Sequence, residues 1–526
     1  MKQFLNRTLS VKQLLALILL PLAIFATIIV FSVGNNGVAL LKKVDGKDST
    51  VVETKLADST GLGILLAYVD SLSNAEQMTG GSWSFCLMNA DSGKSMCAVN
   101  TDRGMVPASV MKVVTTGTAL SILGPKYRFA TTLKYDGTID AATKTLNGNI
   151  YIRGGGDPAL GAETFGSSLN KVTDSWLKAI KALGIDSIAG CIIGDAQASD
   201  QDPIPVGWTW EDIQSDYGTG PCGLNIRENV YDILLKQSGG GVSMKTNPQI
   251  PGLKLYNQVL SNSKIAKSYA YVQGAPFQFE RTVFGEVKDT LRERSAIPDP
   301  ALFCAQLLKN TLIANGVRMK DSATTTRLIR LNGIKLESTK DSKKTIASSL
   351  SPSLEDLVYH TNQISQNFYA ESILRAISMN ENGYGNGASS VGIIYKFWKE
   401  KKLDLRGMCM VDGCGLSRMN NITTRQLVEM LRVFSKDANV FPAFYKSLAV
   451  AGESGTIRKL SHGTLAEGNL HAKSGTMARV KSYAGYVKTK SGKLLCFAMI
   501  GNNTLWTEVE LKYKFEKLFT LMAELP

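Results

Sequence analysis

Residues 107–112 read Pro107-Ala108-Ser109-Val110-Met111-Lys112, and an uncharged run of small and apolar residues, 113–123, follows them. Ser109 and Lys112 stand three residues apart, which places both side chains on one face of a helix. A serine hydroxyl needs an adjacent base to act as a nucleophile near neutral pH. A lysine among apolar neighbours loses hydration, which lowers its pKa and frees the amine to take a proton. The segment therefore predicts a buried helix whose first turn carries a nucleophile, Ser109, and its base, Lys112.

The Ser-x-x-Lys spacing alone is a weak signal, because it also occurs at Ser168–Lys171, Ser175–Lys178 and Ser261–Lys264. Those copies lie in polar or amphipathic surroundings, where a pair of solvated side chains on a helix is the ordinary explanation. The interpretation of Ser109 and Lys112 therefore depends on partner motifs elsewhere in the chain.

Length and charge limit the possible functions. A chain of 526 residues is long enough for two to four domains with substantial cores. The formal net charge is +14, yet no dense Lys/Arg tract with interleaved aromatic residues follows the N-terminus. The composition therefore argues against a nucleic-acid partner and favours a diffusely basic surface, which suits an anionic polymer or a membrane face.

The N-terminal segment, residues 1–37, has the pattern of an export signal. Lys2, Arg7 and Lys12 precede the uncharged run Leu14–Val33, whose 20 residues are enough for a helix to span a bilayer. We expect an uncleaved transmembrane anchor, with a cleaved signal peptide as the alternative. Either predicts an exported, periplasmic or extracytoplasmic protein. Residues 38–58 are polar and lysine-rich, and we interpret them as a linker.

The cysteines and histidines predict no metal site and no cofactor. There is no Cys-x-x-Cys pair, and the three histidines do not have the spacing of a zinc site. The sequence also contains no Gly-x-Ser-x-Gly motif, which argues against a Ser-His-Asp triad. An even number of cysteines in an exported chain permits disulfides, and Cys86 and Cys97 are predicted to face each other across a hairpin turn. Buried free thiols are expected for most of the others. The cysteines are Cys86, Cys97, Cys191, Cys222, Cys304, Cys409, Cys414 and Cys496.

Hydrophobic patterning predicts a discontinuous α+β arrangement. A hairpin is expected over 82–99, and short strands with two helices over 129–330. Helices return over 354–401 and 424–434, before strands at 482–488 and 494–500 and a helix over 507–523. The β-rich middle is therefore predicted to be inserted between two parts of one domain.

A second motif, Ser365-Gln366-Asn367, follows the apolar-periodic segment 354–364. A hydroxyl and an amide two residues apart can both point into a cleft. Ser365 is a candidate proton relay between Lys112 and a leaving amine, and Asn367 is a candidate to orient Lys112 or to bind a substrate carbonyl. The alternative is a simple helix N-cap at Ser365.

A third motif, Lys473-Ser474-Gly475-Thr476, is predicted at a strand edge. Lys473 offers a cation for a substrate carboxylate, and Gly475 permits close approach of the substrate backbone. The N–H groups of Thr476 and Ser109 are candidates for an oxyanion hole, in which one donor is typically worth ~2.7–4 kcal/mol of barrier.

Together these motifs resemble the Ser-x-x-Lys, Ser-Asp-Asn and Lys-Thr-Gly set of penicillin-binding proteins and class A β-lactamases, with Ser474 in place of the commoner threonine. More closely, the chain resembles the penicillin-binding protein 4 type of D-alanyl-D-alanine carboxypeptidase/endopeptidase, the S13 serine peptidase family. The long gap from Ser109 to Ser365 is typical of that family. The resemblance is carried by Ser109–Lys112, Gly154–Pro158, Ser365–Asn367, Asp412–Asn420, Ser454–Thr456 and Lys473–Thr476.

The resemblance implies an α/β transpeptidase-like (serine β-lactamase-like) catalytic domain, residues 59–128 plus 345–526, interrupted by one or two inserted domains, residues 129–344. It implies acylation of Ser109 by peptidoglycan peptides ending in D-Ala-D-Ala, hydrolysis by water, and covalent inhibition by β-lactams. Endopeptidase cleavage of peptide crosslinks is a further expectation.

The resemblance also implies that Arg418 and Asp212 hold the free end of a diaminopimelate side chain. Two alternatives remain at the level of sequence. One is a β-lactamase or esterase with the same machinery, and the other is a non-catalytic peptidoglycan-binding scaffold.

Overall fold

The structure is a computed structural model that describes residues 61–334 and 343–526. The predicted anchor, 1–37, and the predicted linker, 38–58, lie outside these residues. Among the helices that are described, none has both the length and the apolar character needed to cross a bilayer.

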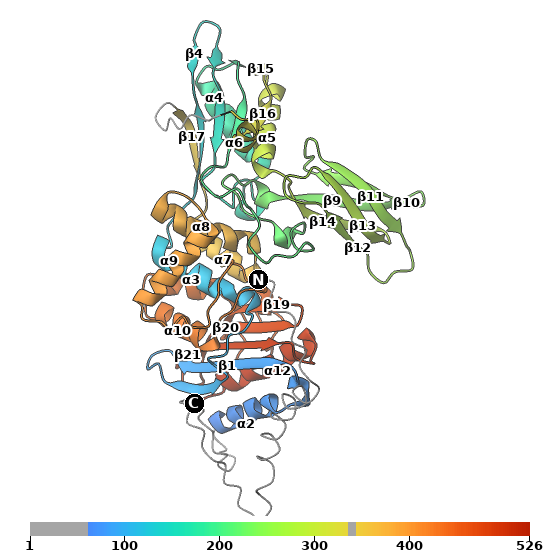
Figure 1. Cartoon of the computed structure of the whole chain (residues 1–526). Helices are drawn as coiled ribbons and strands as arrows, with labels where there is room; N and C mark the ends of the chain where they lie inside the picture. The colour runs from blue at the N-terminus through green and yellow to red at the C-terminus, as the bar shows by residue number, and fades with distance from the viewer. Residues whose placement is uncertain (1–60, 335–342) are drawn as a thin grey trace, which may run out of the picture. The chain divides into compact units, whose positions relative to one another are not determined.

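The catalytic part is built on a six-stranded antiparallel sheet in the order β18-β19-β20-β21-β1-β2. The N-terminal hairpin pairs with the C-terminal strands, so the two ends of the domain share one sheet (Figure 1). Alternate side chains of one strand, such as Phe497 and Ala498, enter the cores on opposite faces. The strands are β1 (Ser82–Asn89), β2 (Ser95–Val99), β18 (Ala449–Val450), β19 (His471–Met477), β20 (Val480–Lys488) and β21 (Leu494–Asn502).

Helices cover both faces of this sheet. One face packs against α2 (Gly61–Ser73) and α12 (Glu508–Ala523), whose apolar residues share a core with the strands. The core on the other face contains the central helix α3, which is buried from residue 111 to residue 120. The remaining helices of that layer are α7 (Leu354–Ile364), α8 (Asn367–Asn382), α9 (Gly387–Glu400), α10 (Thr424–Ser435) and α11 (Phe441–Ser447), and α3 spans Met111–Leu123.

The inserted part contains a five-stranded sheet, β16-β8-β6-β3-β17, and a four-stranded sheet, β15-β7-β5-β4. Helices α4 (Leu169–Ala182) and α5 (Pro300–Ala314) contribute to the same core. The other elements are β3 (Ala130–Tyr135), β4 (Thr138–Asp140), β5 (Thr145–Asn147), β6 (Ile150–Arg153), β7 (Ser187–Ile188), β8 (Ile192–Asp195), β15 (Arg318–Met319), β16 (Ala323–Thr325), α6 (Thr326–Leu331) and β17 (Lys344–Leu350).

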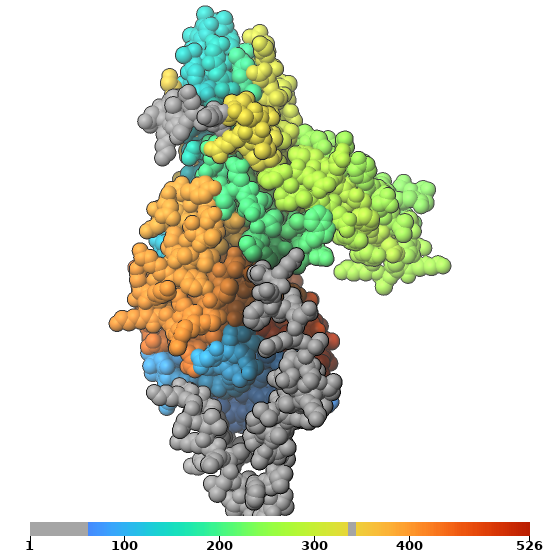
Figure 2. Space-filling view, in the orientation of Figure 1, coloured from blue at the N-terminus to red at the C-terminus, as the bar shows by residue number. Residues whose placement is uncertain are grey.

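A second group of inserted strands forms two three-stranded sheets, β10-β9-β14 and β11-β13-β12, seen in yellow-green in Figure 2. Their inward side chains, among them Ile233 and Val283, are fully buried. The strands are β9 (Val230–Ser238), β10 (Gly241–Asn247), β11 (Lys254–Ser261), β12 (Tyr269–Gln273), β13 (Glu280–Val287) and β14 (Thr290–Ala296).

The chain leaves the catalytic part and returns to it at one place. Strand β17 pairs antiparallel with β3, and the Ser351 N–H donates to the Phe129 carbonyl at 2.9 Å. The boundary predicted between residues 344 and 345 therefore falls inside β17, which is a strand of the inserted sheet. Adjacent entry and exit allow a long insertion without separating the two parts of the catalytic fold.

The predicted contact between Cys86 and Cys97 is wrong. The register of β1 and β2 pairs Cys86 with Ala98 and Leu87 with Cys97, so the two thiols point to opposite faces of the sheet. Cys86 lies in the core below α10, and Cys97 lies in the core shared with α12. All eight cysteines are free thiols in the structure.

Candidate active site

Ser109 lies in a short 3₁₀ turn, Ala108–Val110, directly before α3. The sequence predicted it in the first turn of the helix itself. The turn is held by strand β20, because the Ser482 hydroxyl donates to the Pro107 carbonyl at 2.5 Å. Ala108 has a φ of +48°, a left-handed conformation that is rare for a residue with a side chain. Ser109, the predicted nucleophile, is therefore presented on a tightly constrained turn.

Lys112 is fully buried and its amine contacts three acceptors from three segments. The Nζ atom lies 3.0 Å from Ser109 Oγ, 2.6 Å from Asn367 Oδ1 and 2.7 Å from the carbonyl oxygen of Cys414. The amide of Asn367 is oriented by its other end, because Nδ2 donates to the Tyr217 carbonyl at 2.9 Å. The predicted grouping of Ser109, Lys112 and Asn367 is therefore present in the structure.

The amide oxygen of Asn367 and the carbonyl of Cys414 can only accept, so each takes one N–H of the lysine. The third contact, to the Ser109 hydroxyl, can be made in either charge state of the lysine. The ammonium donates to the hydroxyl, whereas the free amine accepts the hydroxyl proton, which is the arrangement that activation of a serine by a base requires.

Burial lowers the pKa of Lys112 from its ordinary value. Cys414, Asp412 and Glu371 act in the opposite direction and raise it. Burial also lowers the pKa of Lys473 well below its ordinary value, and the nearby amines of Lys112 and Lys481 add to the effect. The positive charge of Lys112 therefore disfavours a second positive charge on Lys473.

Ser365 is the residue that ends α7, with a left-handed backbone at φ +62° and ψ +36°. It is not a helix N-cap, because Gln366 holds that position for α8. Lys473 Nζ donates to Ser365 Oγ at 2.8 Å and to the Ser474 carbonyl at 2.7 Å. The sequence predicted Lys473 at a strand edge, where its cation would face a substrate carboxylate. The structure instead buries Lys473 fully, and it is not among the residues that line the cavity described below.

Strand β19 offers its outer edge to the cleft. Its neighbour β18 pairs only with His471 and Ala472, and no other described strand pairs with that edge from Lys473 onwards. Gly475 lies against the nucleophile turn, where a Cβ atom would come within 2.7 Å of the Pro107 carbonyl oxygen. The Ser474 hydroxyl points the other way and donates to Thr456 Oγ1 at 2.7 Å.

A cavity of about 420 Å³ opens above these residues. It brings together Ser109, Ser365, Asn367 and Thr476 from the catalytic part with Thr209, Asp212 and Tyr217 from the inserted part. Arg418 lies on the same wall as Thr476, and its guanidinium donates to the Ala478 carbonyl at 3.2 Å. The full lining is Ser109, Thr209, Asp212, Tyr217, Ser365, Asn367, Gly415, Leu416, Arg418, Thr476, Met477 and Ala478.

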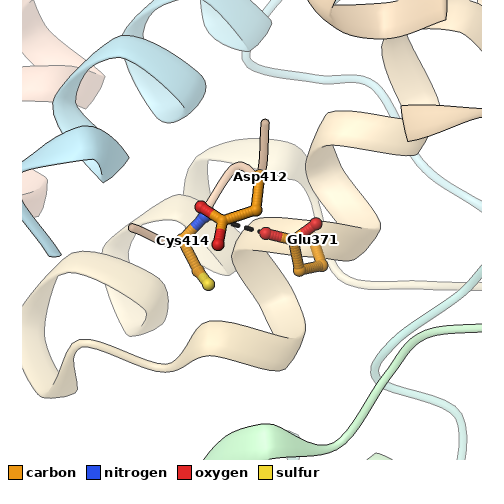
Figure 3. Close-up of side chains that lie close together, drawn as sticks. All are labelled: Glu371, Asp412 and Cys414. Atoms are coloured by element: carbon orange, nitrogen blue, oxygen red, sulfur yellow. Dashed lines mark hydrogen bonds between the residues drawn. The ribbon is translucent and has the colours of Figure 1, made fainter. Parts of the chain in front are cut away.

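Three potential metal ligands, Glu371, Asp412 and Cys414, cluster together (Figure 3), close enough to Lys112 to act on its charge. Their donor set does not fit a cation, because the carboxylate oxygens already accept N–H groups. Asp412 accepts from the backbone of Gly415 and Ser417 and from the side chains of Asn420 and Trp208. Glu371 accepts from the backbone of Gly413 and Cys414 and from Arg375.

Sequence reasoning did not single out Glu371, Arg375 or Trp208. Trp208 belongs to the inserted part and lies 204 positions from Asp412 in the sequence, so no local pattern indicates the contact between them. Glu371 and Arg375 had a usable signal, since they continue from Asn367 at four-residue intervals along one helix.

The model of the D-Ala-D-Ala carboxypeptidase 3 (S13) family matches residues 65–524. The chain belongs to this family. It is 23% identical over 465 residues to the D-alanyl-D-alanine carboxypeptidase of Actinomadura sp. (strain R39), covering 85% of this chain and 83% of that protein. It is 24% identical to the D-alanyl-D-alanine carboxypeptidase DacB of Haemophilus influenzae, covering 83% of this chain and 88% of that protein.

Among solved structures, the S13 chain is similar to penicillin binding protein 4 of Haemophilus influenzae. The TM-score is 0.73 with 21% sequence identity, and the match covers 86% of this chain and 97% of the other. The same protein complexed with a β-lactam gives a TM-score of 0.67 at 20% identity. The chain therefore has the mixed α/β fold of that penicillin-binding protein, with several sheets.

Proposed function

We propose that this protein is a serine-type D-Ala-D-Ala carboxypeptidase that acts on peptidoglycan stem peptides through an acyl-enzyme on Ser109. The observation that carries the proposal is the contact of a buried lysine amine with the Ser109 hydroxyl at the floor of the cavity. Membership of the S13 family, together with the printed activities of the Actinomadura and Haemophilus relatives, supports the same reaction.

In the proposed acylation, Ser109 Oγ attacks the carbonyl carbon of the penultimate D-Ala while its proton passes to the free amine of Lys112. The developing oxyanion is expected to meet the N–H groups of Ser109 and Thr476, on the stretch of β19 beyond the residues that pair with β18. When the C–N bond breaks, the leaving amine takes a proton that Lys112 and Ser365 deliver. Free D-Ala leaves, and the acyl group stays on Ser109.

In the proposed deacylation, a water attacks the ester carbon and gives its proton to the same lysine amine. The ester bond breaks, Ser109 Oγ recovers a proton, and the shortened peptide leaves as a carboxylic acid. Endopeptidase cleavage of a crosslink needs the same steps with a longer amine as leaving group.

Substrate recognition is proposed to use the cavity walls. An extended peptide can add to the free edge of β19, which supplies backbone donors and acceptors. Lys473 acts on the terminal carboxylate through the Ser365 hydroxyl and its own positive potential. Arg418 and Asp212 offer opposite charges to the carboxylate and the ammonium of a diaminopimelate side chain.

Labelled penicillin tests the nucleophile. We expect the wild-type protein to become covalently labelled and Ser109→Ala to remain unlabelled, and an unlabelled wild-type protein would contradict the proposal. Purified muropeptides test the reaction, since mass analysis should show loss of one D-Ala and, for crosslinked substrates, separation into monomers. Rapid turnover of the penicillin would instead favour a β-lactamase.

Export and membrane anchoring are also proposed, on the basis of the positively flanked uncharged run 14–33. In cells that express the full chain, membrane fractionation should recover the protein in the pellet, and external protease should digest it in spheroplasts. A variant that lacks residues 1–37 should remain inside and soluble. Resistance of the full chain to protease in spheroplasts would contradict the export.

A further inference from the structure

Helix α8 carries a buried polar stripe that the proposed mechanism uses only in part. Asn367, Glu371 and Arg375 follow one another at four-residue intervals, so they share one face of the helix. All three are at most 8% exposed. Asn367 contacts the amine of Lys112, whereas the two charged residues have no role in the reaction described above.

Glu371 supports the backbone that holds the lysine. Its Oε1 atom accepts from the N–H groups of Gly413 and Cys414, at 2.6 and 2.8 Å. The carbonyl of the same Cys414 accepts from Lys112 Nζ at 2.7 Å. Figure 3 shows the carboxylate beside Cys414. The position of one acceptor of the lysine is therefore fixed by Glu371.

The other oxygen of Glu371 connects this site to the inserted part. Arg375 Nη1 lies 3.2 Å from Glu371 Oε2, and Arg375 Nε donates to Asp200 Oδ1 at 3.0 Å. Asp200 belongs to the segment after β8 and also accepts from the Asn386 side chain and the Gly387 N–H at the start of α9. A continuous chain of contacts thus leads from the inserted part to the lysine.

The charge of Glu371 also acts on the lysine. The charged groups around Lys112 are Glu371 and Asp412, which favour the cation, and Lys473, which opposes it. Around Glu371 itself lie Asp412, Arg375 and the Cys414 thiol. Burial, with a smaller contribution from Asp412, raises the pKa of Glu371 to about 7, although Arg375 acts to lower it.

We propose that Glu371 is a positioning residue for Lys112, which it acts on through the Gly413–Cys414 backbone, and that Arg375 and Asp200 hold Glu371 in place. The inference rests on the proposed function, because it assigns Lys112 as the base. It predicts that Glu371 affects both the placement of the amine and the pH at which the amine becomes free.

Two variants separate these effects in measurements of labelled-penicillin acylation rate against pH. Glu371→Gln removes the negative charge and turns an N–H₂ group toward a donor. The maximum rate should fall by about 10²-fold, as for a small misplacement of a catalytic group, and the midpoint of the acid limb should move to lower pH. Glu371→Asp keeps the charge on a shorter side chain, so the rate should fall while the midpoint stays near the wild-type value.

The matched control is Asp299→Asn. Asp299 is also a buried carboxylate that accepts a backbone N–H, from Leu302, and pairs with an arginine, Arg327, but it lies in the inserted part at the start of α5. The acylation rate of the Asp299→Asn protein should equal that of the wild type within about twofold, and the midpoint of its pH profile should be unchanged. A pure loss of stability in Glu371→Gln would lower the labelled fraction without moving the midpoint of the rate profile.

A folded Glu371→Gln protein with the wild-type maximum rate and midpoint would overturn the inference. If the Glu371 variants do not fold, Asp200→Asn replaces them. This substitution weakens the ion pair between Asp200 and Arg375, and Asp200 is less buried than Glu371. That variant should acylate at least threefold more slowly, and wild-type kinetics there would overturn the inference. Failure of the wild-type protein to acylate at all would overturn the proposed function instead.

Discussion

Gly475 and Ser109 approach so closely that a Cβ atom on Gly475 would lie 3.0 Å from the backbone nitrogen of Ser109. The middle of β19 is therefore pressed against the turn that carries the nucleophile, and the glycine is required by contact between two backbones, not by its own conformation. The sequence predicted that Gly475 lets the substrate backbone approach, and the contact that the structure shows is instead with the protein's own backbone.

Gly475→Ala should displace the nucleophile turn. The new methyl group would overlap the Ser482 hydroxyl and crowd the Pro107 carbonyl, so the turn or the strand must shift. A shift of about 1 Å in a catalytic group can cost about 10²-fold in rate. Penicillin acylation kinetics and a thermal melt would measure the effect. Gly392→Ala is the control, since it lies in α9 with open space around it and should leave the acylation rate unchanged.

Lys112→Arg should abolish acylation while it preserves positive charge. A guanidinium stays protonated at any pH at which the protein is folded, so it cannot take the proton of Ser109. General-base catalysis typically contributes about 10²–10⁴-fold, and a loss in this range is expected. The measurement is the rate of labelling at saturating penicillin, where binding differences no longer contribute. A variant that retains more than a tenth of the wild-type rate would show that another group is the base.

The rate of acylation should rise with pH. Burial lowers the pKa of Lys112, so the amine is free over a range where an exposed lysine is still charged. The free form is the base, so the rate is lost as pH falls through the lowered pKa and is regained above it. The midpoint should lie below 10.5, the ordinary pKa of a lysine. Stopped-flow labelling from pH 6 to pH 10 measures it, and a rate that falls with rising pH would contradict the assignment.

The three motifs that the structure brings together could be found from the sequence because each is short and its polar residues stand three or fewer positions apart. Their burial was harder to predict. Lys473 reads as a strand-edge cation, yet the structure buries its amine between Ser365 and the Ser474 carbonyl. That outcome depends on the packing of α7 against the sheet, which no local pattern specifies.

The hairpin shows the same limit at the level of register. Cys86 and Cys97 flank one turn, but their relative faces depend on a register shift between Leu87 and Met88. One residue of slip reverses the face of every side chain that follows. The insertion is a contrasting case, because a strand-rich composition and a long gap between motifs indicate it, whereas the pairing of β17 with β3 depends on contacts between distant residues.

Ser365 combines backbone strain with a proposed chemical role, and two substitutions can separate them. Its left-handed backbone disfavours any residue with a Cβ atom, at a cost on the order of 1–3 kcal/mol. Ser365→Ala keeps that strain and removes the hydroxyl, whereas Ser365→Gly removes both. Both variants lose the hydrogen bond from Lys473, so that loss cancels when they are compared with each other.

We therefore expect Ser365→Gly to be more stable than Ser365→Ala by about 1 kcal/mol, as urea denaturation would show. Their hydrolysis of D-Ala-D-Ala peptides should be reduced to a similar, low level, because neither has a hydroxyl to relay the proton to the leaving amine. Equal stability of the two variants would argue against a strained backbone at this position. Wild-type turnover in either variant would remove Ser365 from the proton pathway and leave Lys112 to protonate the leaving group directly.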